Sequence, residues 1–117
     1  MVQSVDGGLL ARMLIHASAS LNAEKQKINE LNVFPVPDGD TGTNMGLTLD
    51  TAAAELRQKQ PETVEQTAAI NASAMLRGAR GNSGVILSLI FRGFSRAMKE
   101  KATMDGIDLA DGLNTGV

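Results

Sequence analysis

The sequence predicts an all-α protein. Apolar residues recur at helical spacings of three, four and seven in several segments, and glycine or proline marks the breaks between them. No alternation of apolar and polar residues is long enough to indicate a strand, and no internal repeat is present. Since 117 residues suit one compact unit, we expect a single domain covering residues 1–117.

The first helix is expected over residues 9–31, with its start near Asp6, because aspartate is a favourable N-cap. Its apolar stripe consists of Leu10, Leu14, Ala17, Leu21, Ile28 and Leu31. The helix cannot continue through Pro35, because proline lacks the backbone N–H and clashes with the preceding turn. Residues 32–42 are therefore expected to form a loop.

Helical spacing resumes at Met45 and continues to about Gln58. Thr43 or Asn44 is positioned to cap this second helix, because both side chains accept hydrogen bonds from orphan N–H groups. The loop thus leads directly into a helix N-terminus.

A third helix is expected from Pro61, which suits a first helical position, to Gly78, which suits a C-terminal stop. A second glycine-rich turn occupies residues 77–84 (RGARGNSG). The helix predicted over residues 85–98 is apolar on most sides, which predicts that it is buried centrally. Residues 103–117 carry a further short helical pattern and stop without a recognisable cap.

The composition excludes several classes of function. A nucleic-acid binder normally shows a basic patch and aromatic stacking residues, whereas this chain has a formal net charge of -2, three Phe and no Trp or Tyr. Its 43% hydrophobic and 21% charged residues are ordinary for a soluble globular protein. No export signal or membrane span is visible, and the absence of cysteine fits a reducing compartment, so a cytoplasmic protein is expected.

Two carboxylates in the first loop are the strongest chemical signal. Asp38 and Asp40 stand one residue apart in residues 35–44 (PVPDGDTGTN), on a chain stiffened by proline and freed by glycine. Mg²⁺ prefers such hard oxygen ligands and commonly shares them with a substrate phosphate. The pattern therefore predicts a metal and phosphate site.

Both glycine-rich turns lead to helix N-termini, where unpaired N–H groups and the helix dipole favour an anion. In the first turn, Gly42, Thr43 and Asn44 offer donors to phosphate oxygens. In the second, Asn82 and Ser83 do the same. The alternative is structural: Asp-Gly is common in turns, and asparagine and serine are common helix caps. The occurrence of two such turns favours the functional interpretation.

Two familiar loops do not fit. An EF-hand fails because its fifth, sixth and twelfth positions would be Gly42, Thr43 and Leu49. A P-loop fails because residues 78–84 are followed by no Lys-Ser or Lys-Thr and preceded by no strand. The predicted phosphate site is therefore of another kind.

Other polar residues carry weaker signals. His16 lies inside the first helix without a neighbouring acid, and such a histidine is usually structural. Arg77 and Arg80 are either surface charges or phosphate ligands. The sequence leaves both interpretations of the arginines open.

Residues 32–45 (NVFPVPDGDTGTNM) resemble the ATP-binding L-subunit domain of the dihydroxyacetone kinase family, most closely its fatty-acid-kinase branch. Residues 80–84 (RGNSG) resemble the second nucleotide motif of that family. The resemblance implies an antiparallel helical barrel that holds ATP or ADP at one end through two Mg²⁺ ions. Asp38 and Asp40 match the carboxylate ligands of these ions.

The resemblance also assigns the remaining site residues. Residues 41–44, namely Thr41, Gly42, Thr43 and Asn44, match the phosphate contacts, and Asn82 and Ser83 match the second nucleotide contact. The dihydroxyacetone branch has histidine in place of Thr41 and an additional acidic metal ligand upstream. Asn32 is the expected replacement for that ligand, and its amide oxygen brings no charge.

The family domain continues well past residue 117, so this chain corresponds to about its first half. If the chain is complete, half a barrel exposes apolar helix faces, and a homo-oligomer is expected.

The sequence thus predicts the nucleotide-binding part of an Mg²⁺-dependent phosphotransferase. By the resemblance, the acceptor is an acyl group or dihydroxyacetone held by a separate subunit or domain. The alternative is a non-catalytic nucleotide-binding or assembly module. Metal-dependent hydrolysis of phosphate esters ranks third, since no general base is evident beside the site.

Overall fold

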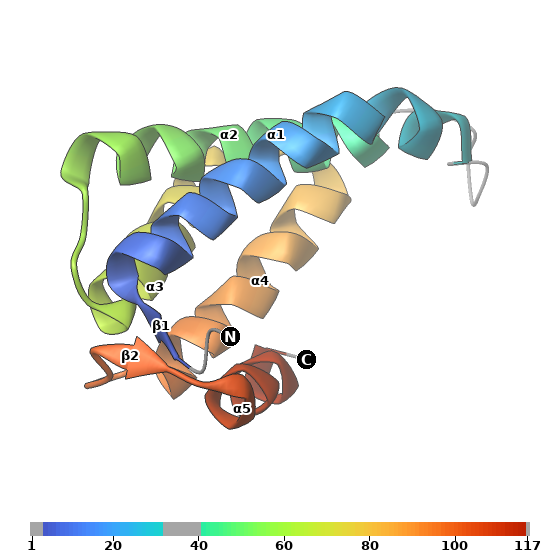
Figure 1. Ribbon diagram of the computed structural model, residues 1–117. Helices are drawn as coiled ribbons and strands as arrows, with labels where there is room; N and C mark the ends of the chain where they lie inside the picture. The colour runs from blue at the N-terminus through green and yellow to red at the C-terminus, as the bar shows by residue number, and fades with distance from the viewer. Residues whose placement is uncertain (1–3, 32–40, 117) are drawn as a thin grey trace.

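The computed structural model confirms the all-α class (Figure 1). It describes residues 4–31 and 41–116. Within these ranges the helices are α1 (Gly7–Leu31), α2 (Thr41–Lys59), α3 (Val64–Gly78), α4 (Gly81–Ala97) and α5 (Gly106–Gly116). Two short strands, β1 (Val5–Asp6) and β2 (Thr103–Met104), pair antiparallel, with Val5 opposite Met104. The expectation of no strand is wrong for these four residues, because a two-residue strand is too short to show alternation.

The first helix begins where the sequence predicts. The backbone N–H of Leu9 donates to Oδ1 of Asp6 at 2.8 Å, so Asp6 satisfies one orphan donor of the first turn. Helix α1 then lies along α2, and α3 and α4 form a second pair across the molecule (Figure 1).

Three other predicted helix starts are wrong. Helix α2 begins at Thr41, so Thr43 and Asn44 lie within its first turn and do not cap it. Helix α3 begins at Val64 and not near Pro61, because Thr63 and Gln66 form a capping box. Thr63 Oγ1 accepts from the backbone N–H of Gln66 at 3.1 Å, and Gln66 Oε1 accepts from the backbone N–H of Thr63. Helix α4 begins at Gly81 and not at Val85, so the predicted turn over residues 77–84 is shorter than expected.

Two apolar clusters form the core. One joins α1, α3, α4 and β2, and its buried members are Leu10, Val64, Ala68, Phe94, Met98 and Met104. The other joins α2 and α3 through Leu49, Ala52, Ala74 and Met75. Phe91 packs against both clusters and makes an edge-to-face contact with Phe94, with 6.1 Å between ring centroids.

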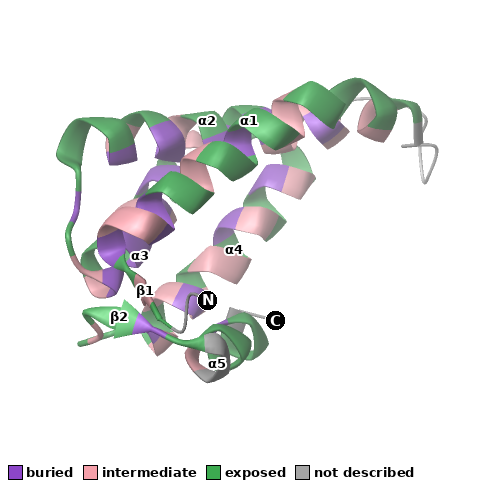
Figure 2. Cartoon of the chain, in the orientation of Figure 1, coloured by how far each residue is buried: buried purple, intermediate pink, exposed green. Residues whose placement is uncertain are grey.

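Helix α4 is less buried than its composition predicts. Val85 is 46% exposed, Ile86 58% and Leu89 49%, and the fully buried positions of the helix are confined to Gly84, Ser88 and Phe94. Figure 2 accordingly shows exposed and intermediate colours over most of α4. The prediction of central burial is therefore wrong, because an apolar helix surface does not itself determine which neighbour covers it.

Candidate functional site

The structure brings the two predicted phosphate-binding segments together. Thr41, Gly42, Thr43 and Asn44 form the first turn of α2, and Asn82 and Ser83 lie in the first turn of α4. The two helices begin at the same end of the molecule (Figure 1). Asp38, Asp40 and Asn32, the predicted metal ligands, lie outside the described residues.

Gly81 brings the start of α4 close to the first turn of α2. It has a φ of 65°, in the left-handed region that favours glycine. A Cβ at this position would overlap the side-chain amide of Asn44. The turn before α4 therefore lies directly against a predicted phosphate contact of α2.

A buried hydroxyl reinforces this contact. Thr48, one turn beyond Asn44 in α2, is fully buried. Its Oγ1 donates to the carbonyl oxygen of Asn44 at 2.8 Å and accepts from the backbone N–H of Arg80 at 3.1 Å. Arg80 is the N-cap residue of α4 and makes no side-chain cap hydrogen bond. Asn82 and Ser83 are therefore not caps, because they lie inside the helix.

Asn29 holds the start of α2 against α1. Its Nδ2 donates to Oγ1 of Thr43 at 2.9 Å, and its Oδ1 accepts from the backbone N–H of Thr43 at 3.1 Å. This N–H, predicted as a phosphate donor, is already engaged within the protein. The hydroxyl of Thr43 accepts from Asn29 and so retains its own proton for a ligand oxygen.

Two glycines in the first turns of α2 allow this helix to lie close to α1. A Cβ on Gly42 would lie 2.5 Å from the carbonyl oxygen of Lys25, and one on Gly46 would lie 2.7 Å from Oδ1 of Asn22. Gly42 is buried, and its absent side chain allows the backbone of α2 to approach the backbone of α1.

A cluster of three polar side chains joins α1 and α2 near the middle of both helices. Asp50 Oδ1 accepts from Ser18 Oγ and from Asn22 Nδ2, each at 2.7 Å. Sequence analysis missed this group and missed Asn29. Their signal was available: residues 18, 22 and 29 follow helical spacings of four and seven, and face residues 42, 46 and 50, which are spaced by four.

A small hollow of about 230 Å³ lies between α2 and the first turns of α4. Its walls are Met45, Ile86, Leu87, Ile90 and the half-buried Ser83. It is apolar except for the serine hydroxyl, and it adjoins the two helix starts. A hydroxyl and an apolar surface thus lie side by side near the starts of α2 and α4.

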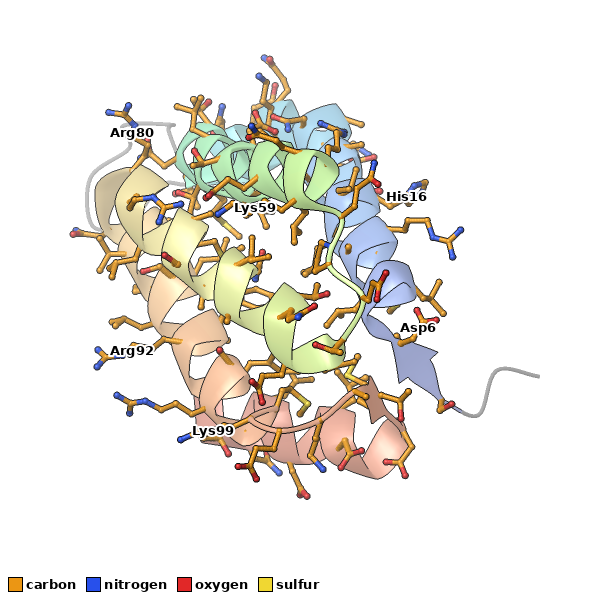
Figure 3. The ribbon with its side chains drawn as sticks, turned by 90° about the vertical axis from the view of Figure 1, so that its left-hand side faces the viewer. Asp6, His16, Lys59, Arg80, Arg92 and Lys99 are labelled. Carbon is orange, nitrogen blue, oxygen red and sulfur yellow. The ribbon has the colours of Figure 1, made fainter. Side chains whose placement is uncertain are left out.

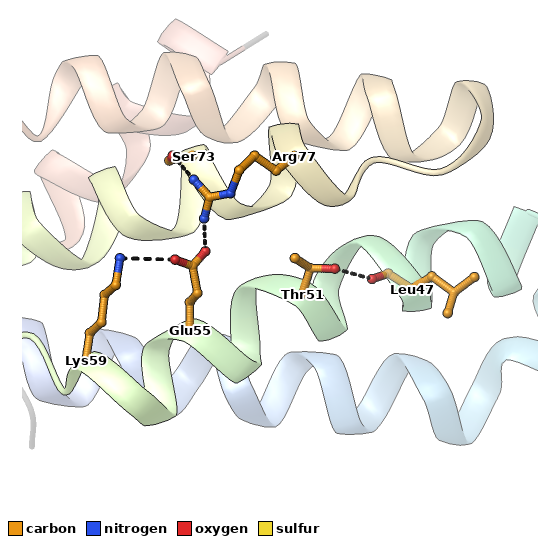
Figure 4. Close-up of polar contacts among 6 residues, drawn as sticks. All are labelled: Leu47, Thr51, Glu55, Lys59, Ser73 and Arg77. Carbon is orange, nitrogen blue, oxygen red and sulfur yellow. Dashed lines mark hydrogen bonds and ion pairs between the residues drawn. The ribbon is translucent and has the colours of Figure 1, made fainter.

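The two arginines differ in their surroundings. Arg77 forms an ion pair with Glu55 and donates to Oγ of Ser73 at 2.7 Å, while Lys59 lies 3.1 Å from the other oxygen of Glu55 (Figure 4). Hydrogen bonding from Lys59, together with the charge of Arg77, lowers the pKa of Glu55. Arg77 thus ties α3 to α2, which supports the structural interpretation of this residue.

Arg80 projects outward at the end where α2 and α4 begin (Figure 3). Arg92 and Lys99 also project outward further along the α4 side of the molecule. His16 is exposed on α1. Among residues 4–31 and 41–116, no helix is long and apolar enough to cross a membrane, and no group of three or more His, Cys, Asp or Glu side chains converges on a metal-sized site.

Comparison with known proteins gives a consistent family match. A family model described as the DAK2 domain matches residues 35–117. Protein YloV of Bacillus subtilis is 40% identical over 116 residues, which cover 99% of this chain and 21% of that protein. An uncharacterized protein of Staphylococcus saprophyticus is 39% identical and one of Staphylococcus aureus strain USA300 is 38% identical, each over the whole chain and 21% of the relative. The chain thus spans about a fifth of these relatives.

Proposed function

Because this chain belongs to the DAK2 domain family, whose members supply the ATP-binding domain of dihydroxyacetone-kinase-type enzymes, we propose that it binds the Mg²⁺ complex of ATP for a phosphotransferase. The observation that carries the proposal is the contact of Gly81 with Asn44, which joins two helix N-termini in one place. Each N-terminus presents orphan N–H groups and the positive end of a helix dipole. Together they suit a ligand with several phosphates.

The metal ligands in this proposal are Asp38 and Asp40, with Asn32 as the third. Asp40 immediately precedes Thr41, the first residue of α2, so a cation bound by the two carboxylates would lie next to a phosphate at the helix start. Two carboxylates and an amide form an oxygen donor set of the kind that suits Mg²⁺, with two ions as the proposed number. When bound, Mg²⁺ neutralises phosphate charge and orients the transferred group.

The chain's own residues would bind and orient the nucleotide. The hydroxyls of Thr41 and Thr43, the backbone of Gly42 and the amide of Asn44 would contact phosphate oxygens from α2. Asn82 and Ser83 would contact the nucleotide from α4, where Ser83 also lines the apolar hollow. Catalysis would then come from positioning and charge neutralisation.

Nucleotide binding in the presence and absence of Mg²⁺ tests this proposal. Asp38→Ala and Asp40→Ala should each weaken Mg²⁺-dependent binding of ATP by more than about tenfold, because each removes a ligand of the cation. Asp111→Ala, at an exposed position of α5, provides a matched loss of one carboxylate away from the site. Equal affinities in all four proteins, with no dependence on Mg²⁺, would refute the proposal.

The acceptor and the compartment belong to the same proposal. The family relationship favours an acyl group or dihydroxyacetone held by a partner subunit or by another domain. The absence of cysteine supports the cytoplasm as the compartment.

A second candidate is a nucleotide-binding or assembly module without turnover. The exposed apolar residues Val85, Ile86 and Leu89 on α4 favour it, because such a face is typical of an interaction surface. For the 117 residues alone, the corresponding proposal is association of two copies through this face. ATP consumption that depends on an added acceptor subunit would favour the kinase, whereas nucleotide-dependent association without turnover would favour the module.

A further inference from the structure

We propose that Thr48 is a positioning residue that fixes the distance between the two halves of the nucleotide site. This inference rests on the proposed function, since it concerns how the starts of α2 and α4 are held on one ligand. Thr48 was not among the residues that the sequence pattern selected. Its role follows from the contacts of a single buried hydroxyl.

The hydroxyl of Thr48 uses both of its hydrogen-bonding capacities. It donates to the carbonyl oxygen of Asn44 in the first turn of α2 and accepts from the backbone N–H of Arg80 at the N-cap of α4. Because the side chain is fully buried, water does not replace either bond when the hydroxyl is removed. Thr48 therefore provides a buried hydrogen-bonded link between the start of α4 and α2, beside the contact of Gly81 with Asn44.

Gly84 provides a second, steric part of the same contact. A Cβ on Gly84 would overlap Oγ1 of Thr48, so the first turn of α4 approaches the hydroxyl as closely as a glycine permits. Together, Arg80 and Gly84 place the N-cap and the first turn of α4 around one atom of α2. Asn82 and Ser83 lie between these two contacts in the chain.

The spacing matters because one ligand must meet donors from both helices. Phosphate contacts from α2 and from α4 can act together only when their separation matches the bound nucleotide. A displacement of about 1 Å of reacting groups can cost roughly a hundredfold in reaction rate, and misplaced phosphate donors should likewise weaken binding. We therefore expect a loss of the Thr48 hydroxyl to weaken binding without removing any group that touches the ligand.

Thr67 provides a matched control within the same protein. It is also a fully buried threonine, and its Oγ1 lies 2.8 Å from the carbonyl oxygen of Gly7 and 3.0 Å from that of Thr63. These contacts join the starts of α3 and α1, at the opposite end of the molecule from the starts of α2 and α4 (Figure 1). Thr67→Val thus removes a comparable hydroxyl from a comparable environment far from the proposed site.

The experiment compares Thr48→Val, Thr48→Ser and Thr67→Val by thermal unfolding and by titration with a fluorescent ATP analogue, with and without Mg²⁺. Thr48→Val should weaken binding of the Mg²⁺ complex by about tenfold or more. Thr48→Ser, which keeps the hydroxyl, should restore most of the affinity. Thr67→Val should lower the unfolding temperature and leave the affinity near that of the unaltered protein.

A second variant approaches the same contact from α4. Gly84→Ala retains the Thr48 hydroxyl but forces the first turn of α4 away from it, so it should also weaken binding. It replaces Thr48→Val as the test should that variant not fold.

The outcomes separate this inference from the proposed function. Absence of nucleotide binding by the unaltered protein would remove both. Binding that is normal in the unaltered protein and unchanged in Thr48→Val, or in Gly84→Ala where that variant is used, would remove only the positioning role. Equal losses of affinity in Thr48→Val and Thr67→Val would also overturn it, because the effect would then be one of general stability.

Discussion

Gly81 connects the backbone conformation of the second turn to the geometry of the site, and Gly81→Ala is therefore an informative perturbation. The residue has a φ of 65°, and a Cβ there would overlap the amide of Asn44. An alanine has two ways to respond. It can keep the left-handed conformation and displace Asn44, or it can leave that conformation and move the start of α4.

The loss of stability in Gly81→Ala is the sum of the cost of the left-handed conformation and the cost of the overlap with Asn44. The left-handed conformation costs an L-residue with a Cβ roughly 1–2 kcal/mol. The overlap with Asn44 adds little to this figure, because the end of a half-buried side chain can rotate away. For a chain of this size, a loss of about 1–2 kcal/mol corresponds to a fall of about 4–8 °C in the midpoint of thermal unfolding.

The effect on binding should exceed what this loss of stability explains. A rotated Asn44 no longer presents its amide to a phosphate, and a shifted α4 start separates Ser83 from α2. Thermal unfolding and titration with the Mg²⁺ complex of an ATP analogue, well below the unfolding transition, measure the two effects separately. We expect affinity to fall by about tenfold, as for other misplaced site residues.

Gly8→Ala is the control for this experiment. Gly8 lies in the first turn of α1, and the nearest atom to a Cβ there is Oδ1 of Asp6 at 3.6 Å, an ordinary contact. Alanine is favoured over glycine in helices, so this variant should be neutral or more stable by up to about 1 kcal/mol. If Gly81→Ala were as stable as Gly8→Ala and bound nucleotide normally, the reasoning about the second turn would be refuted.

Two further predictions concern the start of α2 and the attachment of α5. Asn29→Ala removes both side-chain hydrogen bonds to Thr43 and should weaken Mg²⁺-dependent nucleotide binding about tenfold. Asn22→Ala removes one hydrogen bond within α1 and one to Asp50, but Ser18 still holds Asp50, so this variant should mainly lower stability; equal binding by both variants would contradict this. Lys101 Nζ lies 2.8 Å from Oδ1 of Asp108, and this hydrogen bond lowers the pKa of Asp108. The stability that the aspartate contributes is therefore present above its unfolded-state pKa. It is lost as the pH falls through the lower folded-state pKa. Lys101→Met should therefore unfold at a lower temperature than the unaltered protein at neutral pH, with a difference that shrinks in acid, and a difference independent of pH would exclude this mechanism.

Local sequence signals predicted most of the helices and the segments that form the site. The cap at Asp6 and the stop at Gly78 depend only on residues within a few positions of each other, and both agree with the structure. The start of α2 was misplaced because Thr41 and Gly42 are poor helix formers taken alone. Contacts with α1, a distant segment, favour helix at these positions.

The parts of the site that escaped prediction all depend on contacts between distant residues. Asn29 and Thr43 are 14 positions apart, and Thr48 and Arg80 are 32 apart. Helical periodicity assigns a residue to a face, but it does not identify the helix that will meet that face. The same reason explains why α4 was expected to be buried.

The polar seam, meaning the side-chain hydrogen bonds that join α1 to α2, would restrict where the loop before α2 can lie. Large apolar side chains along a helix pair tolerate small sliding movements, whereas hydrogen bonds require particular partners at particular distances. The register of α2 is specified at its start by the hydrogen bonds between Asn29 and Thr43, and in its middle by those of Asp50 to Ser18 and Asn22. Gly42 and Gly46 let the two backbones lie close together. Asp40 directly precedes Thr41 in the sequence, and Asp38 stands two residues earlier. Fixing the start of α2 therefore also fixes one end of the proposed metal-binding loop. The polar seam would thus limit where the carboxylates can lie, which is a requirement for a site that must meet a second set of donors on α4.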